Sequence, residues 1–175
     1  HLIRGASQMI LRGVGIRVLK GDQMGFSHCA AMDPSSLLKA ADTASRIADG
    51  SRTAPVMDLV ARPVPAIYPE GDSSFDIASL RRWVESLDAA VFAQDDRIVK
   101  CNIGAYCSRD RILVANSLGL LAHDDRPDSG AWAQCVAQQG EVCESNSTSR
   151  AWRRQQHVVF TPSLAQEMAR ELVDW

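Results

Sequence analysis

Apolar and polar residues alternate along positions 14–28 in the manner of a β-hairpin. Val14, Ile16 and Val18 alternate with glycine and arginine, which is the period of a strand with one buried face. Gly21-Asp22 then supplies two residues that tolerate the positive φ of a tight turn. The returning strand carries its larger side chains at Met24, Phe26 and His28. The pattern therefore predicts two short antiparallel strands.

The pair Gly13-x-Gly15 at the start of this hairpin has the spacing of part of a phosphate-binding loop. The third glycine and the helix that should follow are both missing, so we do not expect dinucleotide binding. Small residues in a strand also allow another chain segment to approach closely. We interpret the two glycines in that second way.

A helix is predicted after the hairpin, over residues 33–50. Asp33 can cap the first free amides, Pro34 suits the first helical position, and Gly50 is a typical C-terminal stop. The expected apolar stripe consists of Leu37, Leu38, Ala41, Ala44, Ile47 and Ala48. We expect this helix to cover one face of the hairpin.

Two further helices are predicted, over residues 76–93 and from Thr161 onward. The first has an apolar seam at Ile77, Leu80, Val84, Leu87 and Val91. Trp83 lies beside that seam and is expected to pack. Thr161 and Pro162 have the residue types of an N-cap and a first helical position. The last helix carries its apolar residues at Leu164, Met168, Leu172 and Val173.

The rest of the chain is expected to form a connector and a β-meander. Residues 51–73 contain four prolines, which favours an extended connector with a short edge strand near Leu59-Val60. The predicted strands are Ile98–Cys107, Arg111–Ala115, Leu120–His123, Trp132–Gln138 and Glu141–Glu144, with a break at 126–130. The connections are short, which favours antiparallel pairing. We therefore predict one α+β domain over residues 1–175, with helices packed on one face of an antiparallel sheet.

The composition excludes several classes of function but does not indicate a particular one. The net charge of −2 supplies no field that attracts nucleic acid or an anionic membrane, and no apolar run reaches the length of a membrane span. No signal-peptide pattern is present, and the five cysteines are odd in number and irregularly spaced. We expect a cytoplasmic protein with reduced thiols. Because the first residue is His1 rather than methionine, we expect a piece of a longer chain.

No convincing metal site is found among the potential ligands. His28 and Cys29 should point to opposite faces of a strand, and Cys101 and Cys107 should lie roughly 20 Å apart along one. Two pairings of interest remain, and both lack further ligands: Cys135 with Cys143 across a turn, and the cluster His123-Asp124-Asp125. We expect no metal to be bound by this chain alone.

Nucleophilic catalysis and nucleic-acid binding are equally weakly supported. The sequence has no G-x-S-x-G elbow and no paired-histidine helix. The basic run Arg150-Ala151-Trp152-Arg153-Arg154 has residue types that can hold phosphate and stack on bases. It is a single short cluster on a nearly neutral protein. We interpret it as a solvated or partner-facing loop.

Two motifs in order resemble the N-terminal region of the TldD/PmbA metallopeptidases, once called modulators of DNA gyrase. The first runs from Gly13 to Val18 and is followed by Gly25-Phe26, where Ser27 replaces the usual alanine. The second runs from Arg111 to Pro127 and contains L-V-A-N-S-L-G-L-L-A-H-D-D-R-P. The resemblance covers nearly the whole chain.

This resemblance implies a cytoplasmic zinc peptidase that acts on peptides or unfolded segments as a homo- or heterodimer. The family's H-E-x-x-x-H zinc helix has no counterpart here, so this chain should be inactive alone, with zinc bound in a C-terminal catalytic domain. The chain itself would admit substrate and contribute to assembly. No membrane partner is expected, and nucleic acid is not favoured. The expected peptide-binding or interdomain surface comprises Gly13, Gly15, Arg17, Gly25, Phe26 and Arg126.

The sequence departs from the family pattern at two places, and one alternative function remains open. Asp128-Ser129-Gly130 stands where the family continues with an apolar strand, and residues 145–150 replace a glycine-rich run. Any role of that run in seating substrate is therefore in doubt here. The alternative function is a stand-alone protein-binding or assembly domain without peptidase activity.

Overall fold

The computed structural model describes residues 3–48, 55, 57–65, 67–68, 76–154 and 159–173. Its contacts divide the chain into two compact units, Leu2–Met57 and Asp58–Trp175. The boundary falls inside the proline-bearing segment 51–73, where the sequence had suggested a connector within one domain. We call these the first and second unit. In the described residues, no helix is both long and apolar enough to cross a bilayer.

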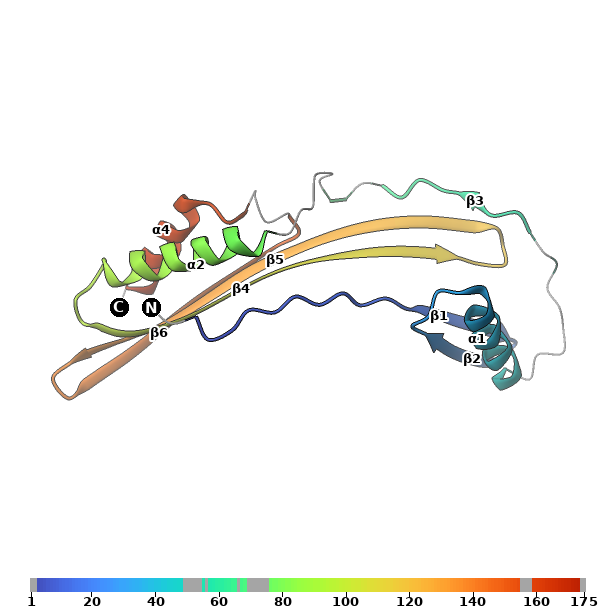
Figure 1. The fold of residues 1–175 in the computed structure, drawn as a ribbon, viewed down its shortest axis with the longest axis horizontal. Coiled ribbons are helices and arrows are strands. Elements are labelled where there is room, and N and C mark those ends of the chain that lie inside the picture. The colour runs from blue at the N-terminus through green and yellow to red at the C-terminus, as the bar shows by residue number, and fades with distance from the viewer. Residues whose placement is uncertain are drawn as a thin grey trace. The chain divides into compact units, whose positions relative to one another are not determined.

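The first unit is a β-hairpin with a helix on one face. β1 (Val14–Lys20) and β2 (Gln23–Cys29) pair antiparallel, with Val14 opposite Cys29, and Gly21 makes the turn at φ 56°. α1 (Pro34–Ile47) follows (Figure 1). The predicted hairpin and helix are thus confirmed.

The cap of α1 is also as predicted, but its C-terminal end is not. The Asp33 carboxylate accepts a hydrogen bond from the Ser36 amide at 3.0 Å, which satisfies one of the free N–H groups of the first turn. The helix ends with Ala48 as its C-cap. Gly50, the predicted stop, lies outside the described residues.

The buried face of the first unit is made of small residues, which differs from the prediction. Alanines 40, 44 and 48 of the helix are buried, whereas Leu38 and Ile47 of the predicted stripe are 70% and 58% exposed. On β2 the covered residue is Gly25, while Met24 and Phe26 face away from the helix. The reason is steric. The helix backbone lies so close to β2 that no side chain fits between them.

Gly25 shows how close this contact is. A Cβ atom added there would lie 2.9 Å from the carbonyl carbon of Ala44 and 3.0 Å from the amide nitrogen of Ala48. Both are backbone atoms of the helix end, so neither can move without moving the helix. A glycine is therefore required at this position.

The second unit is built on a four-stranded sheet. Its elements are β3 (Val60–Ala61), α2 (Ile77–Phe92), β4 (Ile98–Ala115), β5 (Leu120–Gln139), β6 (Val142–Trp152) and α4 (Pro162–Leu172). β4, β5 and β6 form the predicted antiparallel meander with β5 in the centre, and β3 adds in parallel at the far end of β5. The α+β class is confirmed.

β4 and β5 are much longer than predicted. The sequence placed breaks at Ser108–Asp110 and at Arg126–Gly130, but both stretches are paired strand, with Arg109 opposite Pro127. Pro127 is tolerated because, among the described residues, β5 has no partner on its other edge there. β3 pairs with positions 120 and 121, and β6 begins its pairing at Ser129.

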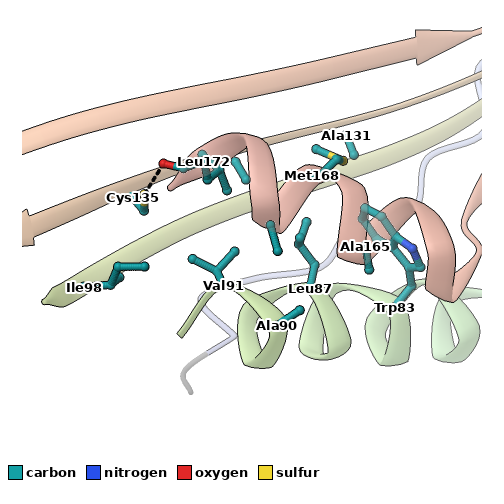
Figure 2. Packing of buried hydrophobic residues seen from close by; sticks show 12 residues of the cluster. Trp83, Leu87, Ala90, Val91, Ile98, Ala131, Cys135, Ala165, Met168 and Leu172 are labelled. Atoms are coloured by element: carbon teal, nitrogen blue, oxygen red, sulfur yellow. Dashed lines mark hydrogen bonds between the residues drawn. The ribbon is translucent and has the colours of Figure 1, made fainter. Parts of the chain in front are cut away.

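Helices α2 and α4 pack on the same face of this sheet and enclose the main core (Figures 1 and 2). The helices supply the large side chains and β5 supplies small ones. The cluster comprises Trp83, Leu87, Ala90, Val91, Ile98, Ala131, Ala133, Cys135, Ala165, Met168, Ala169 and Leu172. Burying each large aliphatic side chain stabilises the fold by about 1.5–3 kcal/mol. Ile77, which the sequence placed in the apolar seam of this helix, is 51% exposed and lies outside the core.

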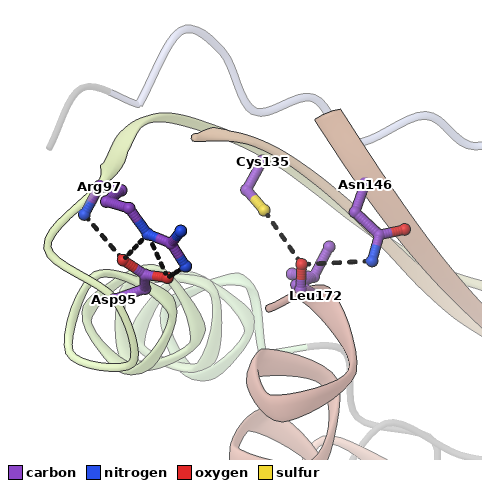
Figure 3. A network of polar contacts seen from close by, with 5 residues as sticks. All are labelled: Asp95, Arg97, Cys135, Asn146 and Leu172. Carbon is purple, nitrogen blue, oxygen red and sulfur yellow. Dashed lines mark hydrogen bonds and ion pairs between the residues drawn. The ribbon is translucent and has the colours of Figure 1, made fainter. Parts of the chain in front are cut away.

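Three polar contacts fix the ends of these helices. The Trp83 indole donates to the Thr161 carbonyl oxygen at 2.9 Å, so the predicted packing of this tryptophan is confirmed. At the end of α4, the Leu172 carbonyl accepts from Cys135 Sγ at 3.5 Å and from Asn146 Nδ2 at 3.3 Å (Figure 3). Sheet side chains thereby satisfy a carbonyl that the helix leaves unpaired.

We predict that Gly25→Ala destabilises the first unit by about 1–3 kcal/mol or more, because the new methyl group must displace the α1 backbone. Hydrogen exchange of the β1–β2 amides measures this. Gly15→Ala is the matched control on the other face of the hairpin, where the new atom meets the Phe26 ring at 3.2 Å. That half-exposed ring can shift, so the control should have the smaller effect. Equal protection in both variants would contradict the close contact.

Candidate functional site

Four of the six surface residues expected from the sequence lie on one face of the hairpin. Gly13 precedes β1, and Gly15, Arg17 and Phe26 stand on the face that α1 does not cover. Phe26 is half exposed, stacks on the His28 ring with centroids 6.2 Å apart, and lies opposite Arg17. These four residues form one continuous exposed patch.

The other two expected residues do not join that patch. Gly25 faces α1, so the backbone that approaches it closely belongs to the chain itself. Arg126 is on β5 in the second unit. Its Nε donates to Asp124 Oδ2 at 2.6 Å, and this hydrogen bond raises the pKa of the guanidinium. The expected site is therefore divided between the units.

A second ion pair holds the middle of the β4–β5 ribbon on the helix-facing side. Arg109 Nε donates to Asp125 Oδ1 at 2.6 Å, and Arg109 Nη2 donates to the other carboxylate oxygen. The pair is bidentate and only 21% and 30% exposed on its two side chains. The hydrogen bond from Arg109 lowers the pKa of Asp125.

The outer edge of β4 is the longest open edge in the described residues. β4 pairs with β5 and with no other described strand over its 18 residues. At the hairpin end, the Asn116 amide bonds the Leu120 carbonyl. Because hydrogen-bonded pairs alternate in an antiparallel ladder, the even-numbered residues of β4 bond β5. The odd-numbered residues, including Leu113, therefore turn their backbone N–H and C=O groups outward.

The sequence could not locate this edge. It predicted two short strands with a break over residues 108–110, which would have interrupted the row of main-chain groups. The signal was present in the alternation of Arg109, Arg111 and Leu113 with their neighbours, but the charges made it look like a turn. The paired register shows that these charges lie within a continuous strand.

Burial raises the pKa of the Cys101, Cys107 and Cys135 thiols, which makes them poor nucleophiles and metal ligands. All five thiols are free, and Cys101 stands directly opposite Cys135 under the helices. Burial, with a smaller effect from Asp88 and Cys135, raises the pKa of Cys101 to about 12, so its thiolate is scarce at neutral pH. The expected contact of Cys135 with Cys143 is wrong, because Cys143 lies opposite Gln138.

The potential metal ligands are also dispersed. Across the residues that the structure describes, no three His, Cys, Asp or Glu side chains are close enough to hold a metal ion. The described part of the chain therefore does not fit a zinc centre, and no chemical step through zinc can be assigned to it.

The basic run at Arg150–Arg154 is partly structural. Arg150 lies in β6 and contacts Glu171 of α4 as an ion pair, so the predicted loop is wrong at this residue. Arg153 reaches Asp128 at 3.9 Å, and the Arg154 carbonyl accepts from the buried Ser129 hydroxyl at 2.9 Å. These contacts tie the run to the sheet and the last helix.

Comparison with known proteins gives two family matches that follow the two units. The sequence profile of the PmbA/TldA metallopeptidase domain 1 matches residues 3–48, and that of the PmbA/TldA metallopeptidase central domain matches residues 70–174. The interval between the matches contains the boundary between the units at 57 and 58. Both lines of evidence thus divide the chain in the same place.

Two curated relatives are proteins called metalloprotease TldD homolog. The one from Buchnera aphidicola is 25% identical over 128 residues, and the one from Haemophilus influenzae is 27% identical over 135 residues. Each alignment covers 72% of this chain but only 26% and 27% of the relative. The chain therefore spans about a quarter of the length of these relatives.

Solved structures share the fold. A protein described as a putative modulator of DNA gyrase from Thermotoga maritima aligns with a TM-score of 0.65 at 15% identity, over 92% of this chain and 37% of that one. TldE from Thermococcus kodakarensis aligns with a TM-score of 0.59 at 17% identity, over 90% and 35%. At these identities the likeness concerns the fold.

We predict that Arg109→Met lowers the free energy of unfolding at pH 7 by about 0.5–1 kcal/mol. Because the folded pKa of Asp125 is lowered, the stabilisation is complete above the unfolded carboxyl pKa of about 3.9 and is lost as the pH falls through the folded value. Denaturant unfolding at pH 7 and below pH 3 should show the difference shrinking. Arg46→Met, in the exposed pair with Asp42, is the control. A difference independent of pH would contradict the role of the pair.

Proposed function

This chain belongs to the PmbA/TldA metallopeptidase family, also written TldD/PmbA, and we propose that it is the substrate-access and assembly part of a zinc metallopeptidase. The peptidase acts on peptides or unfolded segments in the cytoplasm. Its zinc is held by a C-terminal catalytic domain that pairs with this chain. The working protein is a homo- or heterodimer. Membrane and nucleic acid are not among its partners.

The observation that carries this proposal is the open edge of β4. Its 18 residues present a row of outward backbone groups to solvent, and no described strand covers them. An extended polypeptide can pair with such an edge through main-chain hydrogen bonds, which makes binding tolerant of sequence. A protein that admits varied peptides needs this kind of recognition.

The residues of β4 suggest where a peptide would bind. Charged side chains at Arg109, Asp110 and Arg111 occupy the middle of the strand, and charges discourage pairing with another strand. Beyond them, Leu113 and Val114 are 67% and 48% exposed. The apolar end near the β4–β5 turn is therefore the more favourable segment for an added strand.

The patch on the hairpin is the second surface included in the proposal. Leu19 and Met24 stand opposite each other beside Phe26, and they are 71%, 56% and 50% exposed. A two-stranded sheet with one uncovered apolar face is rarely stable alone. This exposed apolar face supports assembly with another domain or subunit.

We predict that Leu113→Pro abolishes binding of an extended peptide, because proline removes an outward N–H while edge strands tolerate it. Leu113→Ala keeps the N–H and is the matched control. Anisotropy of a fluorescent, unstructured peptide measures binding, and circular dichroism verifies the fold. If the two variants bind equally, the main chain of β4 is not the site.

We also predict that the 175-residue chain hydrolyses no peptide with added zinc, whereas the longer protein that contains it does. The reason is that no ligand set for zinc is formed by the described residues. A peptidase assay on both proteins, with a chelator-treated control, measures this. Robust hydrolysis by the chain alone would overturn the non-catalytic role. An inactive long protein that still binds peptide would favour the alternative of a binding or assembly domain.

A further inference from the structure

The uncovered face of the β4–β5–β6 sheet carries two aromatic side chains in an unusual setting. Tyr106 of β4 lies opposite Gly130 of β5, and Trp132 of β5 lies opposite Gly104 of β4. These positions alternate with the residues under α2 and α4, so both rings stand on the face that the helices leave open.

Each ring lies flat across the glycine on the neighbouring strand. A Cβ atom at Gly104 would meet the Trp132 indole at 2.5 Å from Cε2 and 2.8 Å from Cζ2. A Cβ atom at Gly130 would meet the Tyr106 ring at 2.7 Å from Cζ. Each ring thus packs on a glycine of the neighbouring strand, and the opposite face of the ring is exposed. The two side chains are 48% and 46% exposed.

The positions beside the Trp132 ring on this face carry no charge. The neighbouring positions on the same face include Gln134 of β5 and Ser149 of β6, which stands opposite Trp132. Rigid aromatic rings combined with short hydroxyl and amide side chains are typical of surfaces that recognise polypeptides. No Lys or Arg stands directly beside the two rings on this face, which argues against a phosphate backbone as the ligand.

Carboxylates lie at one end of this platform. Asp128 is one pair beyond Tyr106 and Gly130, and Asp110 follows on β4. Arg126 stands opposite Asp110 and already shares a hydrogen bond with Asp124, while Asp128 meets Arg153 only at 3.9 Å. The three carboxylates outnumber the two guanidinium groups, so this end of the platform has a net negative charge. A ligand with a basic residue next to its ring-binding part would match the charge.

We infer that this face docks a proline-rich polypeptide segment in the polyproline II conformation, with a Lys or Arg residue beside the prolines. The backbone groups of these strands are hydrogen-bonded to one another within the sheet. A ligand on this face must therefore be recognised through its own rings and carbonyl groups. Polyproline II offers both, since its carbonyls have no internal partner and proline rings stack on aromatic side chains.

The spacing also fits. The pairs Gly104–Trp132 and Tyr106–Gly130 are separated by two residues along the strands, which is a distance of about 7 Å. Two residues of polyproline II advance about 6 Å. Neighbouring ring positions of the ligand can therefore contact Trp132 and Tyr106 together, with the basic residue directed toward Asp110 and Asp128.

The experiment uses the whole chain and two labelled peptides. The first contains five consecutive prolines and one flanking arginine, and the second replaces the prolines with alternating alanine and serine. We expect anisotropy to show binding of the first only. Trp132→Ala and Tyr106→Ala should each weaken binding about tenfold or more, because buried aromatic contacts dominate such interfaces. Leu118→Ala, at an exposed turn position, is the control and should bind as the original chain does.

A second measurement does not depend on the variants folding. In a ¹H–¹⁵N spectrum of the chain, the proline-rich peptide should shift the indole N–H signal of Trp132 and leave that of the buried Trp83 unchanged. Asp110→Asn should weaken binding of the arginine-bearing peptide more than that of a version with alanine in its place.

Several outcomes would overturn the inference. They are equal affinity for both peptides, no shift at Trp132, or preferential binding of a neutral oligosaccharide that displaces the peptide. A concentration-dependent dimer that buries Trp132 without any peptide would overturn it as well. The proposal is separate from the β4 edge: Leu113→Pro should leave proline-peptide binding intact, so a failure at either surface can be distinguished from a failure at the other.

Discussion

Both units depend on helices that pack against strand positions carrying small residues. In the first unit, Gly25 lies against the last turn of α1, at backbone distances that exclude even a methyl group. In the second, alternate positions of β5 carry Ala131, Ala133 and Cys135 beneath α2 and α4. Apart from Ile98 of β4, the large side chains of this core come from the helices. The small residues of β5 leave room for the large side chains of the helices, which fill the layer between helices and sheet.

The same constraint determines which residues are left outside. Because strand positions alternate, small residues on the covered face bring the larger ones to the opposite face. Met24 and Phe26 are exposed for this reason on β2, and Trp132 is exposed for this reason on β5. In each unit helices cover one face of the sheet, and the other face carries exposed side chains.

The sequence predicted the order of elements well, because the signals at helix starts are local. Asp33, Asp76 and Thr161 all accept hydrogen bonds from the first-turn amides, as their residue types suggest. It failed where tertiary packing overrides local preference. The motif assigned Gly25 to a peptide-binding or interdomain surface, but the residue packs against the end of α1.

Strand continuity and the candidate surfaces were harder to predict from the sequence. Pro127 and the charges around it have the composition of a turn, yet they lie in a paired strand whose open edge needs no amide at Pro127. Residues 108–110 are likewise paired strand, so β4 has one long open edge. The expected surface residues were chosen from motifs, and motifs do not tell which face of a strand a helix will cover.

The two surfaces proposed for the second unit, the open edge and the open face, would recognise different properties of a polypeptide. The edge of β4 offers backbone donors and acceptors, so it selects extended segments with free amides. Proline is a poor ligand there because it lacks the N–H. The face around Trp132 offers rings and side-chain donors, so it selects segments whose carbonyls and rings are exposed, and proline is favoured. The two surfaces therefore exclude each other's best ligands, and one substrate chain with both kinds of segment would be held at two points.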